Sequence, residues 1–193
     1  REELTQALRT SVDTFRRMQE QREATLERST TLIATLPTLK ALMTSGDRPT
    51  IQDASGDLYA LAGSDLFVLA DRQGQIAAIH ATVPGFPPNV AEAAIQRDLA
   101  DGQSRDWWYG GGHLYQVFLQ PIYFGARESN QVIGILAVGY DTGGSLAADV
   151  GRVAAGQVAF GYGGQLVAGT VTGALAADLA RLVAANPAQD LPP

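Results

Sequence analysis

The feature that most constrains the fold is an apolar stripe along residues 4 to 43. Apolar side chains recur there at steps of three and four, with Arg, Glu and Gln between them. The stripe comprises Leu4, Leu8, Val12, Phe15, Met18, Leu26, Ile33, Leu36, Leu39 and Leu42. This spacing predicts an amphipathic helix about 60 Å long, at a rise of about 1.5 Å per residue. We expect Pro37 to kink or restart the helix near Leu36, since proline lacks an N–H and clashes with the preceding turn, and Gly46 to end it.

A helix of this length is longer than the core of a small domain. Its N-terminal half is charged around most of its circumference. We therefore expect this half to project toward a membrane, a neighbouring helix or a second copy of the chain. The alternative is a long helix that lies wholly across its own domain.

A second helical segment is predicted from Asp47 to about Leu61. Asp47 is a favourable N-cap residue, and Pro49 suits the first turn of a helix. Gly63 is expected to end the segment. Its inner face is predicted to carry Ile51, Ala54, Leu58 and Leu61.

The pattern then changes to the shorter runs that are typical of strands. Residues 65–70 and 75–79 are apolar runs on either side of a turn at 71–74, which predicts a β-hairpin. A helix is expected from about Val90 to Ala100. Three further strands are expected at Asp106 to Tyr109, His113 to Ile122 and Gln131 to Tyr140. Together these elements predict an α+β fold, with the long N-terminal helix packed on a mixed, mainly antiparallel sheet.

A weak internal repeat predicts the start of a second lobe. A short helix is expected at 145–153, and Gln157 to Ala168 then repeats the order of apolar strand, glycine turn and apolar strand. A helix from Ala174 to Ala185 follows. The predicted domains are a stalk helix at 1–45, a lobe at 46–144, and a linker helix with a partial second lobe at 145–193.

Composition excludes several classes of function. The chain has 193 residues and no cysteine, which rules out disulfide scaffolds, thiolate zinc sites, iron–sulfur clusters and cysteine nucleophiles. With only two histidines, a histidine-rich metal site is excluded too. We expect neither a metal nor a cofactor. A net charge of -6 with scattered arginines argues against nucleic-acid binding, because phosphate contacts require clustered basic residues.

The chain carries no apolar run long enough to span a membrane, which would take about eighteen residues or more. It begins at Arg1 without methionine and ends at Pro193. We interpret it as a fragment whose flanking segments hold any membrane anchor. Nucleophile-elbow and zinc-protease motifs are missing from the sequence, so we expect no enzymatic activity.

Several stretches resemble the double Cache family of extracellular or periplasmic sensor domains, whose lobes are PAS-like. The resemblance rests on residues 32–42 at the end of the long helix, 65–76 in the first hairpin, the strand pair 113–122 and 132–141, and 157–168 at the start of a second lobe. The match is one of pattern and covers most of residues 1 to 141.

The resemblance implies a receptor input domain held between two membrane helices. Members of this family pass their signal to histidine kinases, as in two-component systems, to nucleotide or diguanylate cyclases, or to chemoreceptors. The known ligands of similar domains are small molecules, often amino acids, organic acids or amines, bound in the pocket of a PAS-like lobe. The ligand-induced movement of a long helix is consistent with this role, since differential affinity for two packings is sufficient for a switch.

The most specific candidate site lies in residues 105–109. The Arg105 guanidinium is suited to grip a carboxylate, while Trp107 and Tyr109 supply an aromatic wall. In the family that this chain resembles, amino-acid-binding members place Arg, Trp and Tyr comparably, although Trp108 stands at the tyrosine position here. The alternative is that these rings are strand-packing residues and Arg105 is a solvated turn charge.

Further candidate ligand-binding residues lie on the next strands. Strand alternation places Tyr115 on one face and Gln116 on the other, where Gln116 and Gln120 are either ligand hydrogen-bonders or solvent-facing. Asp141 resembles the position at which amine-binding relatives keep an acidic residue; otherwise it begins an ordinary turn. His80 is expected to follow the first hairpin, as a pH sensor, a ligand contact or a surface residue.

The function predicted from these features is ligand sensing at the periplasmic or extracellular side of a bacterial inner-membrane receptor. We expect a polar and aromatic pocket between the sheet and the 84–105 connection, a small amino acid, carboxylate or amine as ligand, and a homodimer formed through the N-terminal helix. The alternative is a ligandless domain for dimerisation or for docking a partner protein.

Overall fold

The computed structural model describes residues 17, 20–21, 23–125, 131–142, 148, 151–152, 157, 159–162 and 164–185. Its contacts divide the chain into two compact units. The first, which we call the sheet unit, comprises Glu23–Gly111 and Tyr115–Tyr140. The second, the terminal unit, comprises Arg1–Arg22, Gly112–Leu114 and Asp141–Pro193. Each unit is described by itself.

The first helix is continuous over residues 23–35 and stops at Leu36. Leu36 is extended, with φ -61° and ψ 130°, as expected for a residue that precedes proline. Helix α2 (Pro37–Ser45) then restarts with proline in its first turn and ends at Gly46 in the left-handed conformation. The restart near Leu36 and the end at Gly46 are confirmed. The apolar positions from Leu4 to Met18 lie outside the described residues.

The segment after Gly46 forms two helices, so the prediction of one helix is wrong. Asp47 caps α3 (Arg48–Ala54) by accepting the Thr50 N–H. The helix breaks at Ser55, and α4 (Gly56–Ala62) follows. The Ser55 hydroxyl is 3.1 Å from the Gln52 carbonyl oxygen and 2.8 Å from His80 Nε2, and a glycine with low helix propensity comes next.

The break also changes which side chains face inward. The buried positions are Ile51, Ser55 and Leu58, spaced four and three residues apart. Ala54 and Leu61 are exposed, contrary to the expectation for the inner face. The inner stripe therefore includes a serine, which the apolar pattern alone did not indicate.

Five strands form one sheet in the order β2-β1-β5-β4-β3. Their bounds are β1 (Leu66–Ala70), β2 (Ile76–Ala81), β3 (Arg105–Gly110), β4 (His113–Tyr123) and β5 (Val132–Asp141). Strand β1 pairs antiparallel with β2 and, on its other side, with β5. Asp71 stabilises the β1–β2 turn, because its side chain accepts the Gln73 and Gln75 N–H groups at 2.9 Å each. All five predicted strands are confirmed to within a few residues.

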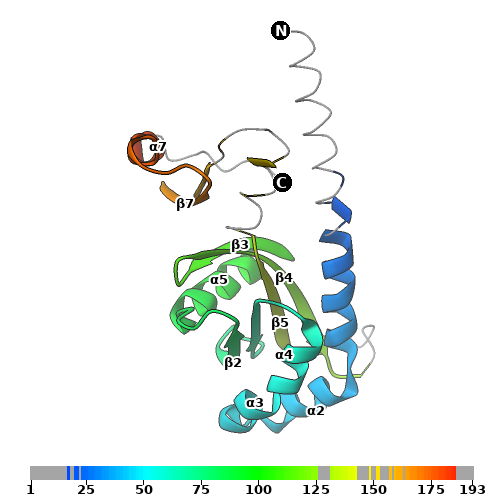
Figure 1. Ribbon diagram of the computed structural model, residues 1–193. Helices are drawn as coiled ribbons and strands as arrows, with labels where there is room; N and C mark the ends of the chain where they lie inside the picture. Colours follow the sequence, from blue (N-terminus) through cyan, green and yellow to red (C-terminus); the bar gives the residue numbers. More distant parts are fainter. Residues whose placement is uncertain are drawn as a thin grey trace. The chain divides into compact units, whose positions relative to one another are not determined.

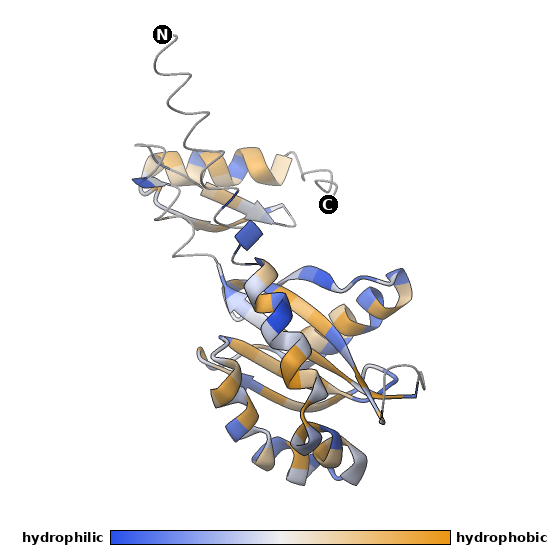
Figure 2. Cartoon of the chain, turned by 90° about the vertical axis from the view of Figure 1, so that its right-hand side faces the viewer, coloured by the Kyte–Doolittle hydropathy of each residue, from blue (hydrophilic) through white to orange (hydrophobic). Residues whose placement is uncertain are grey.

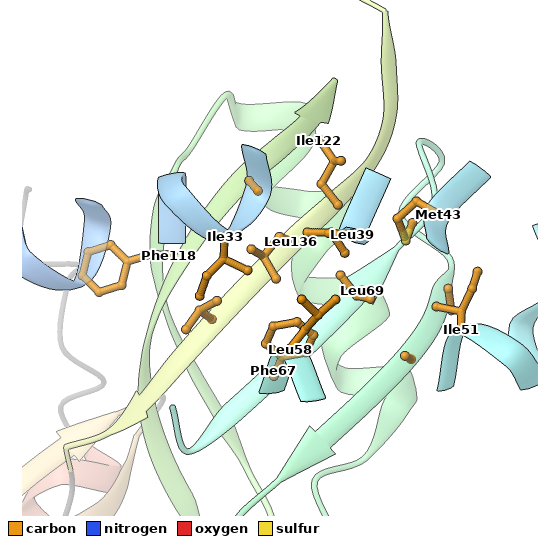
Figure 3. Packing of buried hydrophobic residues seen from close by; sticks show 14 of the residues in the cluster. Ile33, Leu39, Met43, Ile51, Leu58, Phe67, Leu69, Phe118, Ile122 and Leu136 are labelled. Carbon is orange, nitrogen blue, oxygen red and sulfur yellow. The ribbon is translucent and has the colours of Figure 1, made fainter. Parts of the chain in front are cut away.

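Helices cover both faces of this sheet (Figure 1). The first helix and α2 to α4 lie on one face, which we call the helix face, and α5 (Pro88–Asp101) covers the opposite α5 face. The helix-face core contains Ile33, Leu39, Met43, Ile51, Phe67, Leu69, Phe118 and Leu136, which pack together in Figure 3. The α5-face core contains Leu66, Val68, Phe86, Ile95, Trp108, Tyr115 and Val117. The α+β architecture of a helix-backed antiparallel sheet is confirmed.

In the terminal unit, β6 (Ala159–Tyr162) and β7 (Gln165–Gly169) form an antiparallel hairpin. Helix α7 (Ala174–Ala185) follows and packs on it, since a Cβ atom at Gly161 would meet Val183 Cγ1 at 2.9 Å. Figure 2 shows α7 as mainly hydrophobic, interrupted by hydrophilic residues. The predicted hairpin and helix are confirmed. The predicted 145–153 helix is described only at residues 148, 151 and 152, which are helical.

Candidate functional site

A polar cluster joins the first helix to strands β3 and β4 on the helix face. Glu23 Oε1 lies 2.6 Å from Gln116 Nε2, and Glu23 Oε2 lies 3.3 Å from Arg105 Nη1. Two predicted site residues, Arg105 and Gln116, are therefore brought together, with a carboxylate from the first helix between them. We call Glu23, Arg105 and Gln116 the carboxylate cluster.

The environment of the cluster differs from side chain to side chain. Gln116 is 7% exposed, whereas the side chains of Glu23 and Arg105 are 28% and 54% exposed. A buried amide that donates to a carboxylate makes a charge-assisted hydrogen bond, which is stronger than a neutral one. The exposed Arg105 contact is worth less, because solvent screens it.

Gln120, four residues after Gln116 on the same face of β4, also contacts the first helix. Its Oε1 accepts a hydrogen bond from the Thr31 hydroxyl at 3.2 Å. Both glutamines thus face the helix, and Gln116 is not part of a solvent-facing row. The alternation along β4 is confirmed, since Phe118 belongs to the helix-face core and Val117 to the α5-face core.

The sequence carried a signal for Glu23 that the search for candidate site residues missed. On the inner side of the first helix, Leu26 and Ile33 alternate with Glu23 and Thr30 at helical spacing. Thr30 is buried and bonds the Leu26 carbonyl oxygen at 2.9 Å. The spacing of the stripe predicts an apolar residue at position 23. A glutamate there indicates a buried partner on the sheet.

Trp107 and Tyr109 follow Arg105 at alternate positions of β3 and are half-buried. The alternation of strand side chains places them on the same face as Arg105. Trp108 points the other way and belongs to the α5-face core. Ligand binding by Trp107 and Tyr109 stays a prediction.

Tyr115 lies on the opposite face of the sheet from the carboxylate cluster. It packs with Phe86, whose ring centroid is 5.5 Å away in a T-shaped arrangement, and Phe86 also contacts Trp108 at 6.4 Å. Phe86 approaches the sheet so closely that a Cβ atom at Gly110 would lie 2.7 Å from its Cε2. These rings occupy the region between the sheet and the 84–105 connection, where a pocket was predicted.

Asp98 is a buried carboxylate of the α5 face that sequence reasoning did not select. Its Oδ2 accepts the Trp108 Nε1–H at 3.1 Å, and its Oδ1 lies 3.3 Å from Arg97 Nη2. Arg97 also contacts Asp106. Burial, followed by the negative charge of Asp106, raises the pKa of Asp98 to about 6. The signal was an Asp at helical spacing from the apolar positions Ala91, Ala94 and Ile95.

His80 lies within strand β2 and does not follow the hairpin, which corrects the expectation. Its Nε2 is 2.8 Å from the Ser55 Oγ, and its ring stacks on Tyr59 with centroids 5.4 Å apart. Desolvation lowers the pKa of His80. The histidine therefore joins β2 to the break between α3 and α4.

Asp141 ends β5 and belongs to the terminal unit. Its Oδ2 is 2.6 Å from His113 Nδ1, at the start of β4. Ligand binding by Asp141 stays a prediction. Among the described residues, no group of three or more His, Asp or Glu side chains could hold a metal ion. In the same part of the chain, the helices are too short or too polar to cross a bilayer.

Solved structures of sensor domains are among the known proteins to which this chain is similar. The periplasmic domain of Vibrio cholerae LuxQ matches with a TM-score of 0.56 and 15% identity, over 89% of this chain and 79% of that one. The sensor domain of the V. cholerae histidine kinase DctB matches with a TM-score of 0.53 and 12% identity, over 84% and 65%. No family model and no curated protein matches. At this identity the similarity shows a shared fold, the PAS-like fold of periplasmic sensor domains.

Proposed function

We propose that this chain is the sensory input domain of a membrane-bound signal-transduction receptor, that it faces the periplasm, and that it belongs to the double Cache family. The histidine-kinase, cyclase and chemoreceptor outputs remain alternatives within this proposal, which assigns no catalysis to the chain. The shared fold with the LuxQ periplasmic domain and the DctB sensor domain supports it.

The observation that carries the proposal is the attachment of the first helix to the sheet. Glu23 bonds to β3 and β4, Thr31 bonds to β4, and Ile33 is part of the helix-face core. A change in the packing of β3 or β4 therefore acts directly on this helix. A sensor requires such a connection, because ligand affinity must differ between two arrangements of the structure.

We place the ligand, an amino acid, a carboxylate or an amine, at the helix-face side of β3 and β4. Arg105, Trp107, Tyr109 and Gln116 are the proposed contacts. Tyr115 faces the other side of the sheet, and Asp141 belongs to the terminal unit, so neither lies in the same cluster. Domains divided at residues 45 and 144, and a homodimer formed through the N-terminal helix, are further parts of this proposal.

A ligandless role in dimerisation or partner docking is the second candidate. The packing of Phe86, Trp108 and Tyr115 favours it, because these rings fill the α5-face region where a pocket was predicted. A domain without a ligand would transmit the binding of a partner protein through the same helix–sheet contacts.

Thermal unfolding of the 193-residue chain in the presence of amino acids, carboxylates and amines separates the two candidates. Binding to the native state raises the midpoint temperature of unfolding. A ligand at a concentration of a hundred times its Kd stabilises the fold by about 2.7 kcal/mol. We expect at least one class to stabilise the chain, and stabilisation by an amino acid or a carboxylate to be lost in Arg105→Gln. If none of the three classes stabilises the chain, ligand sensing is contradicted and the docking role is left.

A further inference from the structure

The carboxylate cluster has the donors of a carboxylate receptor. Arg105 offers a guanidinium and Gln116 an amide NH2, and each points at a different oxygen of one carboxylate, that of Glu23. Guanidinium and amide donors recognise carboxylates by charge-assisted hydrogen bonds. The chemistry that holds Glu23 is therefore equally suited to a free carboxylate.

The cluster is both anchored and accessible. Gln116 is buried in the sheet and so holds a fixed donor, while more than half of the Arg105 side chain is in solvent. The charged neighbour of Arg105 along the chain, Asp106, contacts Arg97 of α5. An anion from solution can thus reach the guanidinium while Gln116 stays in place.

We propose that Arg105 and Gln116 form a binding site for a ligand carboxylate, and that Glu23 is a built-in competitor which fills this site when the ligand is absent. The inference rests on the proposed sensing function and narrows it to carboxylates. A ligand that takes the place of Glu23 breaks the bonds from the start of the described helix to β3 and β4. Ile33 continues to hold the later turns in the core, so the release is confined to the first turns.

The competition predicts how the affinity changes when Glu23 is altered. Glu23→Gln keeps the size of the side chain but removes the competing charge. Sodium acetate should then half-saturate the site at an about tenfold lower concentration than in the unchanged chain, which corresponds to about 1.4 kcal/mol. The readout is the side-chain amide NMR signal of Gln116 in the 193-residue chain, titrated at constant ionic strength.

Matched variants and probes make this measurement specific. Glu27→Gln changes the same charge at an exposed position of the same helix, so it should leave the acetate midpoint unchanged. Arg105→Gln should abolish the response, and ethylammonium chloride should produce none in any variant. If Glu23→Gln does not fold, as judged by circular dichroism, Glu23→Asp serves in its place, because its shorter side chain withdraws the carboxylate.

Equal acetate midpoints in Glu23→Gln and the unchanged chain would overturn the inference, as would a response that persists in Arg105→Gln. These outcomes are distinct from failure of the proposed function. An amine that stabilises the chain without shifting the Gln116 signal leaves sensing intact and removes the carboxylate site. Acetate that displaces Glu23 without changing the output of a receptor that contains this chain leaves the site intact and removes sensing.

Discussion

Asp98 shows how a single residue can make the α5 face sensitive to pH. Its carboxylate is buried beside Trp108, and the charged groups that face it are Arg97 on α5 and Asp106 on β3. Burial is the main reason that the pKa of Asp98 rises from its usual value to about 6, and the charge of Asp106 adds to it. The folded state therefore binds a proton more readily than the unfolded chain between about pH 4 and pH 6.

The sign of the resulting stability change follows from this difference. A raised carboxyl pKa stabilises the fold fully below the unfolded value of 3.8, and the contribution is lost as the pH rises through about 6. Relative to Asp98→Asn, the unchanged chain should gain on the order of 2 kcal/mol in free energy of unfolding between pH 7 and pH 4. Urea unfolding of both chains across this range measures it. Parallel pH profiles for the two chains would show that the pKa of Asp98 does not differ between the folded and unfolded states.

At the level of residues, sequence reasoning found donors but not their partners. Arg105 and Gln116 were selected for their chemistry, and both lie in the carboxylate cluster. Glu23, which is partly exposed, and Asp98, which is buried, both lie on the inner side of an amphipathic helix. Both were missed because the pattern shows only that a polar residue interrupts the stripe. Which strand such a residue meets depends on tertiary packing, which local periodicity does not contain.

At the level of elements, the orientation of the first helix decides what it can transmit. Ile33 is 6% exposed and packs into the helix-face core, whereas its neighbour Leu32 is 67% exposed. Ile33→Ala should therefore destabilise the chain by about 2–5 kcal/mol, since it removes buried apolar atoms and leaves a cavity. Leu32→Ala should change the free energy of unfolding by less than about 0.5 kcal/mol. Similar losses for both variants in urea unfolding would mean that the helix packs in another orientation.

Local chemistry explains which elements were predictable. Pro37 stops the first helix and restarts the next one by sterics, and Gly46 ends α2 through its backbone freedom. Both limits were predicted from sequence. The break at Ser55 was not, because a single glycine such as Gly56 is tolerated inside a helix, and the contact between the Ser55 hydroxyl and His80 of β2 is a tertiary one. The insertion of β5 between β1 and β4 was equally beyond reach, since strand order is set by long-range pairing.

At the level of the whole molecule, we predict that occupation of the carboxylate cluster changes the position of the first helix against the sheet. The chain has no cysteine, so two introduced cysteines take spin labels selectively. Thr25 on the first helix and Gln103 before β3 are both exposed and both belong to the sheet unit. Thr25→Cys and Gln103→Cys together therefore report the helix–sheet distance.

Electron paramagnetic resonance of the doubly labelled chain tests this claim most directly. We predict one narrow distance distribution without acetate, and a longer, broader component in saturating sodium acetate or in the Glu23→Gln background. The Glu27→Gln background should give the narrow distribution when acetate is absent. Distributions that stay identical with and without acetate, and with and without the Glu23 carboxylate, would contradict the claim that the site controls the helix.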